Sequence, residues 1–249
     1  EISGNEKVAF NGTGGDELFG NYSKWLRYEH PLERYKQTKH FLQIGEKKTE
    51  FVLHPNGTIY HKYMTEGMKN RVVNKPYHGI INTNTWLEKT WRECPSGRWR
   101  DRIPYVDFKI QLPEEFLMML DRFSMNFSIE ARVPFLDREL VENILGIPAQ
   151  LRTKKYNAKY LLKEAFGDML PKELLSFPKS GFAIPQNAWL KNELKEMVVD
   201  MCTGTTIKQQ GLFSADLEKQ LILPFYNGRN DLTLLVWTVL MFQRWYFNQ

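Results

Sequence analysis

The chain of 249 residues lacks several features that would assign it to a class of protein at once. It has no apolar run as long as a membrane span, and we expect neither a membrane segment nor a signal peptide. Its two cysteines, Cys94 and Cys202, lie far apart, without the spacing of a disulfide framework or a zinc site. Cysteine usage of this kind is typical of a reducing compartment, so we expect a cytoplasmic protein.

The chain also has little excess charge. A net charge of +5, spread along the sequence, favours anionic small molecules only slightly. One basic-aromatic stretch lies at residues 98–102, but no second one accompanies it, so we expect no nucleic-acid partner. Four Asn-x-Ser/Thr sequons are interpreted as chance, because two of them fall in the glycine-rich segment described next, where a glycan would obstruct a binding site.

Three glycines followed by two acids form the most informative segment, Asn-Gly-Thr-Gly-Gly-Asp-Glu-Leu-Phe-Gly-Asn-Tyr at residues 11–22. Gly12, Gly14 and Gly15 allow a tight turn whose backbone N–H groups can approach an anion. Asp16 and Glu17 stand where a helix is expected to begin and could hold a hard cation such as Mg²⁺. The alternative is a glycine turn with an acidic helix cap.

Elsewhere the helical period of apolar residues dominates, and the many aromatic residues indicate a folded chain. One or two helices, broken near Pro31, are predicted over residues 17–42. Further helices are predicted over 86–91, 114–128, 137–146, 157–166, 187–202, 214–222 and 231–247, with a hairpin at 51–60 and a loop at 94–105. Asp137 and Asn157 are the expected caps of their helices. We expect the helices at 114–128 and 231–247 to bury their apolar faces, with Phe123 and Phe127 on the first.

A short apolar strand, residues 8–10, leads into the glycine turn. We expect it to be buried, and a single buried strand in a helical chain makes sense if the rest of a parallel sheet lies upstream of residue 1.

Two further clusters carry chemically useful groups. Residues 121–137 contain several charged side chains within an apolar pattern, including Glu130 and Arg132. They could form a site or a structural network of ion pairs. Residues 177–185 place Lys179 on a glycine-containing loop, where it could face a phosphate or simply be solvated.

These three clusters resemble the glutamine-hydrolysing asparagine synthetase family, in the C-terminal part of its synthetase domain. Residues 12–22 resemble that family's Gly-acidic-Gly-Gly/Ser-Asp-Glu-Leu-Phe-Gly-Gly-Tyr turn. Residues 122–137 resemble its Arg-x-Ser/Thr-Met-x-x-Ser-x-Glu-x-Arg-x-Pro-Phe-Leu-Asp run, and residues 178–185 its Pro-Lys-x-Gly-Phe-x-x-Pro loop. The resemblance implies a mainly helical chain that forms the C-terminal part of an α/β adenine-nucleotide alpha-hydrolase-like (ATP pyrophosphatase) domain. Residues 1–249 would form one such part, with an irregular insertion at about 43–105.

The resemblance also implies an activity. In such ligases ATP activates a carboxylate, here aspartate as first expectation, as an acyl-adenylate with release of pyrophosphate; ammonia from a glutaminase domain or subunit then attacks. ATP and Mg²⁺ are the implied cofactors, and a homodimer is one assembly that we consider. The implied roles are catalysis by Glu130, Lys179 and Thr13, nucleotide binding by Gly12, Gly14, Gly15 and Arg132, and metal binding by Asp16.

Two departures and one absence leave alternatives open. Thr13 stands where asparagine synthetases usually carry an acid, and Phe177 where an arginine commonly precedes Pro-Lys. These changes suit the same chemistry on another carboxylate, such as a sugar uronic acid or a peptide side chain. The family's Ser-Gly-Gly-x-Asp-Ser pyrophosphate loop and its glutaminase domain are not among these residues, so we expect the 249 residues alone to be inactive. A non-catalytic homologue that binds a partner is the other alternative.

Overall fold

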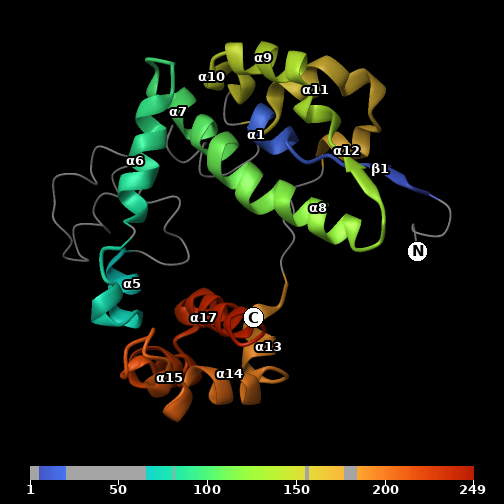
Figure 1. The fold of residues 1–249 in the computed structure, drawn as a ribbon. Helices are drawn as coiled ribbons and strands as arrows, with labels where there is room; N and C mark the ends of the chain where they lie inside the picture. The colour runs from blue at the N-terminus through green and yellow to red at the C-terminus, as the bar shows by residue number, and fades with distance from the viewer. Residues whose placement is uncertain (1–5, 21–65, 81, 155–156, 177–183) are drawn as a thin grey trace. The chain divides into compact units, whose positions relative to one another are not determined.

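The computed structural model describes residues 6–20, 66–80, 82–154, 157–176 and 184–249 (Figure 1). The predicted hairpin at 51–60 and residues 21–42 of the first predicted helix lie outside the described residues. The chain divides into two compact units, each made of two segments: Glu1–Asn56 with Trp86–Pro178, and Gly57–Thr85 with Lys179–Gln249.

The sheet of the first unit is a parallel pair of three-residue strands, β1 (Val8–Phe10) and β2 (Glu130–Arg132). β1 was expected from the sequence, but the expectation that it is buried is wrong: Phe10 is 75% exposed. Side chains alternate between the two faces of a strand, and only the central residues, Ala9 and Ala131, lie on the half-buried face.

Helix α1 (Gly15–Phe19) follows the glycine turn and is largely buried. It packs against η4 (Asp107–Leu117), η5 (Pro134–Leu136), α9 (Arg138–Gly146) and α11 (Tyr160–Phe166). The predicted helix was longer, but α1 stops at Phe19 because Gly20 adopts φ 73°, a left-handed conformation that terminates helices.

Helices α6 (Thr83–Glu93) and α7 (Trp99–Val106) precede η4, a π-helical segment that continues into α8 (Met118–Met125). The loop predicted over 94–105 is therefore wrong for most of its length. Its prolines and glycine suggested irregular structure, but side-chain bonds from Ser96 and Arg98 to Asp101 organise the start of α7. The segment 43–105, expected to be irregular, contains α5 (Glu66–Val72), α6 and most of α7 in its described part.

The helix predicted over 114–128 is present, but the burial of its apolar face is wrong. Phe123 and Phe127 are 68% and 64% exposed. The spacing of apolar residues defines a face of a helix, whereas burial depends on what other segments cover that face.

Three short helices complete the first unit: α10 (Ala149–Arg152), η7 (Gly167–Met169) and α12 (Lys172–Ser176). Asp137 caps α9 as predicted, since its Oδ1 accepts a hydrogen bond from the Leu140 N–H at 3.1 Å. The prediction that Asn157 caps α11 is wrong, because the N-cap residue of this helix is Lys159. The Asn157 Oδ1 instead accepts a hydrogen bond from Lys163 Nζ at 3.3 Å.

The second unit is helical. Besides α5 it contains η3 (Lys75–Tyr77), α13 (Gln186–Lys191), α14 (Lys195–Cys202), α15 (Gly204–Gln210), η8 (Glu218–Ile222), α16 (Leu223–Tyr226), η9 (Asn230–Leu232) and α17 (Thr233–Tyr246). The prediction that the last helix is deeply buried is confirmed for its first three turns, where Leu235, Val236, Val239 and Leu240 lie in the core.

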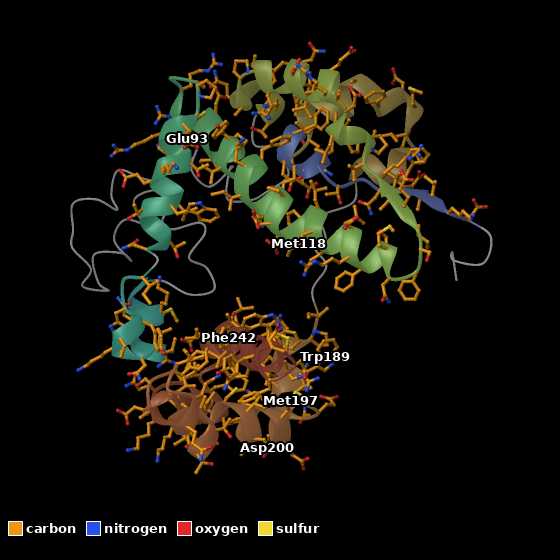
Figure 2. The ribbon with its side chains drawn as sticks, in the orientation of Figure 1. Glu93, Met118, Trp189, Met197, Asp200 and Phe242 are labelled. Carbon is orange, nitrogen blue, oxygen red and sulfur yellow. The ribbon has the colours of Figure 1, made fainter. Side chains whose placement is uncertain are left out.

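The core of this unit takes buried side chains from α13, α14 and α17 and also from α5, α15, η8, α16 and η9. Figure 2 shows Trp189, Met197 and Phe242 among the packed side chains, with Asp200 at the outer edge. An antiparallel bridge between Val73 and Phe213 joins the two segments of the unit. No helix of the described residues is long and apolar enough to cross a membrane.

Candidate functional site

Parallel pairing of β1 and β2 brings two of the sequence motifs to one edge of the sheet. Val8 pairs with Glu130 and Phe10 with Arg132, and the Asn11 N–H donates to the Arg132 carbonyl at 2.8 Å. The glycine turn therefore begins beside the residue that ends β2. Pairing of strands 120 residues apart was not predictable from local patterns, and β2 was not expected to be a strand.

The three glycines of the turn have different surroundings. Gly14 adopts φ 94°, and a Cβ there would overlap the side chain of Leu136. A Cβ at Gly15 would lie 3.2 Å from the ring of Phe135. Gly12 has neither a positive φ nor any atom within 4 Å of a built Cβ. Packing explains glycine at positions 14 and 15, and open space at position 12 leaves room for a ligand.

Thr13 is bonded back to the start of the turn. The Asn11 Oδ1 accepts from the Thr13 N–H at 2.9 Å and from the Thr13 Oγ1 hydroxyl at 2.6 Å. Asn side chains commonly close turns in this way. The threonine hydroxyl thus has a structural partner in addition to any contact with substrate.

Asp16 lies in the first turn of α1 and forms an ion pair with Lys159. The Lys159 Nζ is 2.6 Å from the Asp16 Oδ1, and the two side chains are 31% and 30% exposed. The Lys159 N–H also donates to the Gly20 carbonyl at 3.1 Å. Lys159 was not among the predicted site residues, because no local pattern indicates which lysine meets an acid 143 positions earlier.

Glu130 and Arg132 lie on the same face of β2 and form an exposed ion pair, with Nε to Oε1 at 2.8 Å. Their side chains are 59% and 56% exposed. The hydrogen bond to Glu130 raises the pKa of the Arg132 guanidinium. Both side chains are more than half exposed, so the desolvation penalty of the pair is small and both groups are accessible to a ligand.

Arg152 contacts α1 through a hydrogen bond to the backbone of this helix. It is buried, and its Nη1 donates to the Leu18 carbonyl at 2.5 Å. Burial lowers the pKa of the Arg152 guanidinium to about 10, while the negative charge of Asp101 acts in the opposite direction. An arginine anywhere in an apolar pattern could have this role, so it could not be predicted from local residues.

The remaining predicted residue, Lys179, lies outside the described residues. The described residues hold no group of three or more His, Cys, Asp or Glu side chains that could bind a metal. Magnesium is often held by one or two carboxylates and substrate phosphates, so Asp16 alone fits a partial set of ligands. The arrangement joins an open glycine turn, the carboxylate of Asp16 paired with Lys159, and a Glu–Arg pair.

Comparison with known proteins gives the class and then the family. A model described as asparagine synthase matches residues 1–246, so the class is that of the asparagine synthases. The chain belongs to the asparagine synthase family.

Curated relatives support the assignment. Glutamine-hydrolysing asparagine synthetase 1 of Bacillus subtilis is 29% identical, over 96% of this chain and 40% of the relative. A putative glutamine-hydrolysing asparagine synthetase of Mycobacterium bovis is 25% identical, over 96% of this chain and 39% of the relative. Amidase chry2 of Gibberella zeae is 23% identical, over 92% of this chain and 39% of the relative. The chain thus spans about two fifths of the length of these relatives.

Proposed function

We propose that these residues belong to an ATP-dependent, amide-forming ligase that activates a carboxylate as an acyl-adenylate and releases pyrophosphate. Ammonia derived from glutamine then attacks the activated carbonyl. The observation that carries the proposal is the register of β1 and β2, because it places Arg132 beside the start of the glycine turn, with Glu130 paired to Arg132 on the same face of β2. Membership of the asparagine synthase family supports the reaction class.

The turn is proposed to bind the nucleotide. The backbone around Gly12, Gly14 and Gly15 would approach the phosphates, with Gly12 as the position that packing leaves open. Asp16 would hold Mg²⁺, which when bound offsets negative charge on the departing pyrophosphate. Lys179, proposed from its motif, would contribute a second cation to the same anion.

Glu130 is the proposed general base, which accepts a proton from the attacking amine. Its accessible carboxylate and its bond to Arg132 support this role, because the arginine fixes the direction of the Oε1 atom. Arg132 donates through Nε in that bond, and its remaining N–H groups are proposed to contact the nucleotide.

Aspartate is the first proposed substrate, since relatives of this chain are named asparagine synthetases. A second candidate is another carboxylate, such as a sugar uronic acid or a peptide side chain. Thr13 favours this second candidate, because a neutral side chain bonded to Asn11 stands where an acid is expected. One relative is named an amidase and not an asparagine synthetase. The catalytic role of Thr13 is thus proposed to concern the choice of substrate.

The test separates the two half-reactions in the full-length protein. ATP–pyrophosphate exchange measures formation of the adenylate, and amide formation from ammonia measures both steps. E130Q is expected to lower amide formation about 10²- to 10⁴-fold and to leave exchange near the wild-type rate.

E142Q is the matched control, because Glu142 also pairs through Oε1 with an arginine Nε, that of Arg138, at 2.8 Å on the surface. It should leave both rates unchanged. Equal loss of exchange and amidation in E130Q would contradict the role of Glu130 as base. Absence of exchange in the wild type with aspartate and with the other carboxylates would instead favour a non-catalytic homologue.

A further inference from the structure

Lys159 is held in an unfavourable backbone conformation. Among the described residues, Ser128 and Lys159 are the non-glycine residues with a positive φ, and Lys159 has φ 56°. Residues with a side chain adopt this left-handed region at an energetic cost, and such strain often marks functional positions. The surrounding contacts must therefore hold Lys159 in place.

Two contacts do so, and both are made with α1. The Lys159 N–H bonds to the Gly20 carbonyl beyond the end of the helix, and the ammonium pairs with Asp16 in its first turn. The neighbouring lysines have other partners: Lys154 Nζ is 3.4 Å from the Tyr160 hydroxyl, and Lys163 Nζ bonds to Asn157. Of these three lysines, Lys159 is the one whose ammonium contacts Asp16, the proposed metal ligand.

A lysine and a metal ion compete at such a carboxylate. Magnesium binds a carboxylate oxygen at about 2.0–2.1 Å, and it requires near-ideal octahedral geometry. An ammonium 2.6 Å from the Oδ1 atom occupies one face of the group and repels a dication nearby. A nucleotide changes this balance, because its phosphates carry enough negative charge to offset the ammonium.

We propose that Lys159 is the resident counter-ion of Asp16, which positions the carboxylate and makes the site admit a divalent cation together with nucleotide phosphate rather than alone. This inference rests on the proposed function, in which Asp16 is a metal ligand. Lys159 is thus a positioning residue. A permanent structural ion pair is the competing explanation, and it predicts no effect of Lys159 on metal affinity.

Manganese provides the probe, because free Mn²⁺ can be measured by electron paramagnetic resonance without any catalytic turnover. Titrations use the full-length protein with and without ATP. K159Q removes the charge, and K159G removes the charge while relieving the strain at φ 56°, which guards against misfolding. K159R keeps the charge, and K163Q removes a charge from the same helix without touching Asp16.

Both K159Q and K159G should tighten binding of Mn²⁺ alone by about tenfold, since one unit charge acts on a dication a few ångströms away. K159R and K163Q should stay within about twofold of wild type, and the gain should disappear with D16N in the same chain. With ATP present, the gain should become smaller or reverse.

Unchanged affinity in K159Q and K159G, with weaker binding in D16N, would overturn this inference and leave Asp16 as a metal ligand. Unchanged affinity in D16N itself would overturn both the inference and the metal assignment of the proposed function. A gain in K163Q equal to that in K159Q would also overturn the inference, because general charge would then explain the effect.

Discussion

The glycine turn should tolerate alanine at position 12 and reject it at position 14. At Gly14 two effects combine. The left-handed conformation at φ 94° costs a side chain about 1–2 kcal/mol. A Cβ would also lie 2.8 Å from Leu136 Cγ and closer still to Leu136 Cδ2, and such overpacking costs about 1–3 kcal/mol. G14A should therefore destabilise α1 by about 2–5 kcal/mol. G12A meets no atom within 4 Å and should stay within about 0.5 kcal/mol of wild type.

Native-state hydrogen exchange of α1 is the suitable assay, because a chain with two units need not unfold in one step. The Leu18 N–H bonds to the Gly14 carbonyl at 3.0 Å and the Gly20 N–H to the Asp16 carbonyl at 2.9 Å, so both amides report on the helix. G14A should speed their exchange at least about 30-fold, and G12A should leave it unchanged. In an L136A background the packing part of the G14A effect should vanish.

Nucleotide binding gives the second half of the same experiment. G12A should weaken ATP binding although α1 stays stable, since a methyl group would stand where the ligand approaches. If G12A speeds exchange as much as G14A does, the division into packing glycines and a ligand-facing glycine is refuted.

Two other predictions concern buried polar groups. Burial alone would raise the pKa of the Asp101 carboxyl, but hydrogen bonds from the Ala149 N–H, Ser96 and Arg98 hold it below its ordinary value. The ionised Asp101 carboxylate therefore stabilises the folded state above about pH 4, and this contribution is lost as the pH falls through the folded-state pKa. D101N should unfold at a lower temperature than wild type at pH 7, and the difference should shrink towards pH 3 in thermal scans. A constant difference across that range would contradict the assignment. Gln243 is buried and uses both ends of its amide: its Nε2 donates to the Met201 carbonyl at 2.6 Å, and its Oε1 accepts from the Gln210 Nε2 at 2.7 Å. Q243L should destabilise the second unit by about 1–3 kcal/mol in urea unfolding, whereas the exposed control Q249L should not; equal midpoints for the two would show that the buried amide contributes nothing.

Features with a local cause could be predicted from the sequence. Asp137 caps a helix because its side chain reaches an N–H group three residues later, and the apolar run of α17 is buried along most of its length. The short strand before the glycine turn belongs to the same group. In each case the residues that cause the structure are neighbours in the chain.

Features that depend on distant partners could not be predicted. Lys159 meets Asp16, Arg152 meets the Leu18 carbonyl, and β2 pairs with β1, each across more than 100 residues. Phe123 shows the converse error: helical spacing placed it on an apolar face that was expected to be buried, but its side chain is 68% exposed. The family resemblance predicted a set of residues that share a site, which stays a prediction, and it did not indicate the ion pair at Asp16.

The division of the second unit into two chain segments has a consequence for biosynthesis. The Asn74 side chain bonds to the Gly211 carbonyl across 137 positions, and the Ser214 N–H bonds to the Val72 carbonyl in the same place. A ribosome adds about 5–20 residues per second, so α5 emerges several seconds before the segment that it packs against. During that interval the helix lacks the core residues that the second segment supplies. Completion of this unit therefore waits for synthesis of its second segment, and destabilising changes near Val73 should reduce the yield of folded protein more than its final stability.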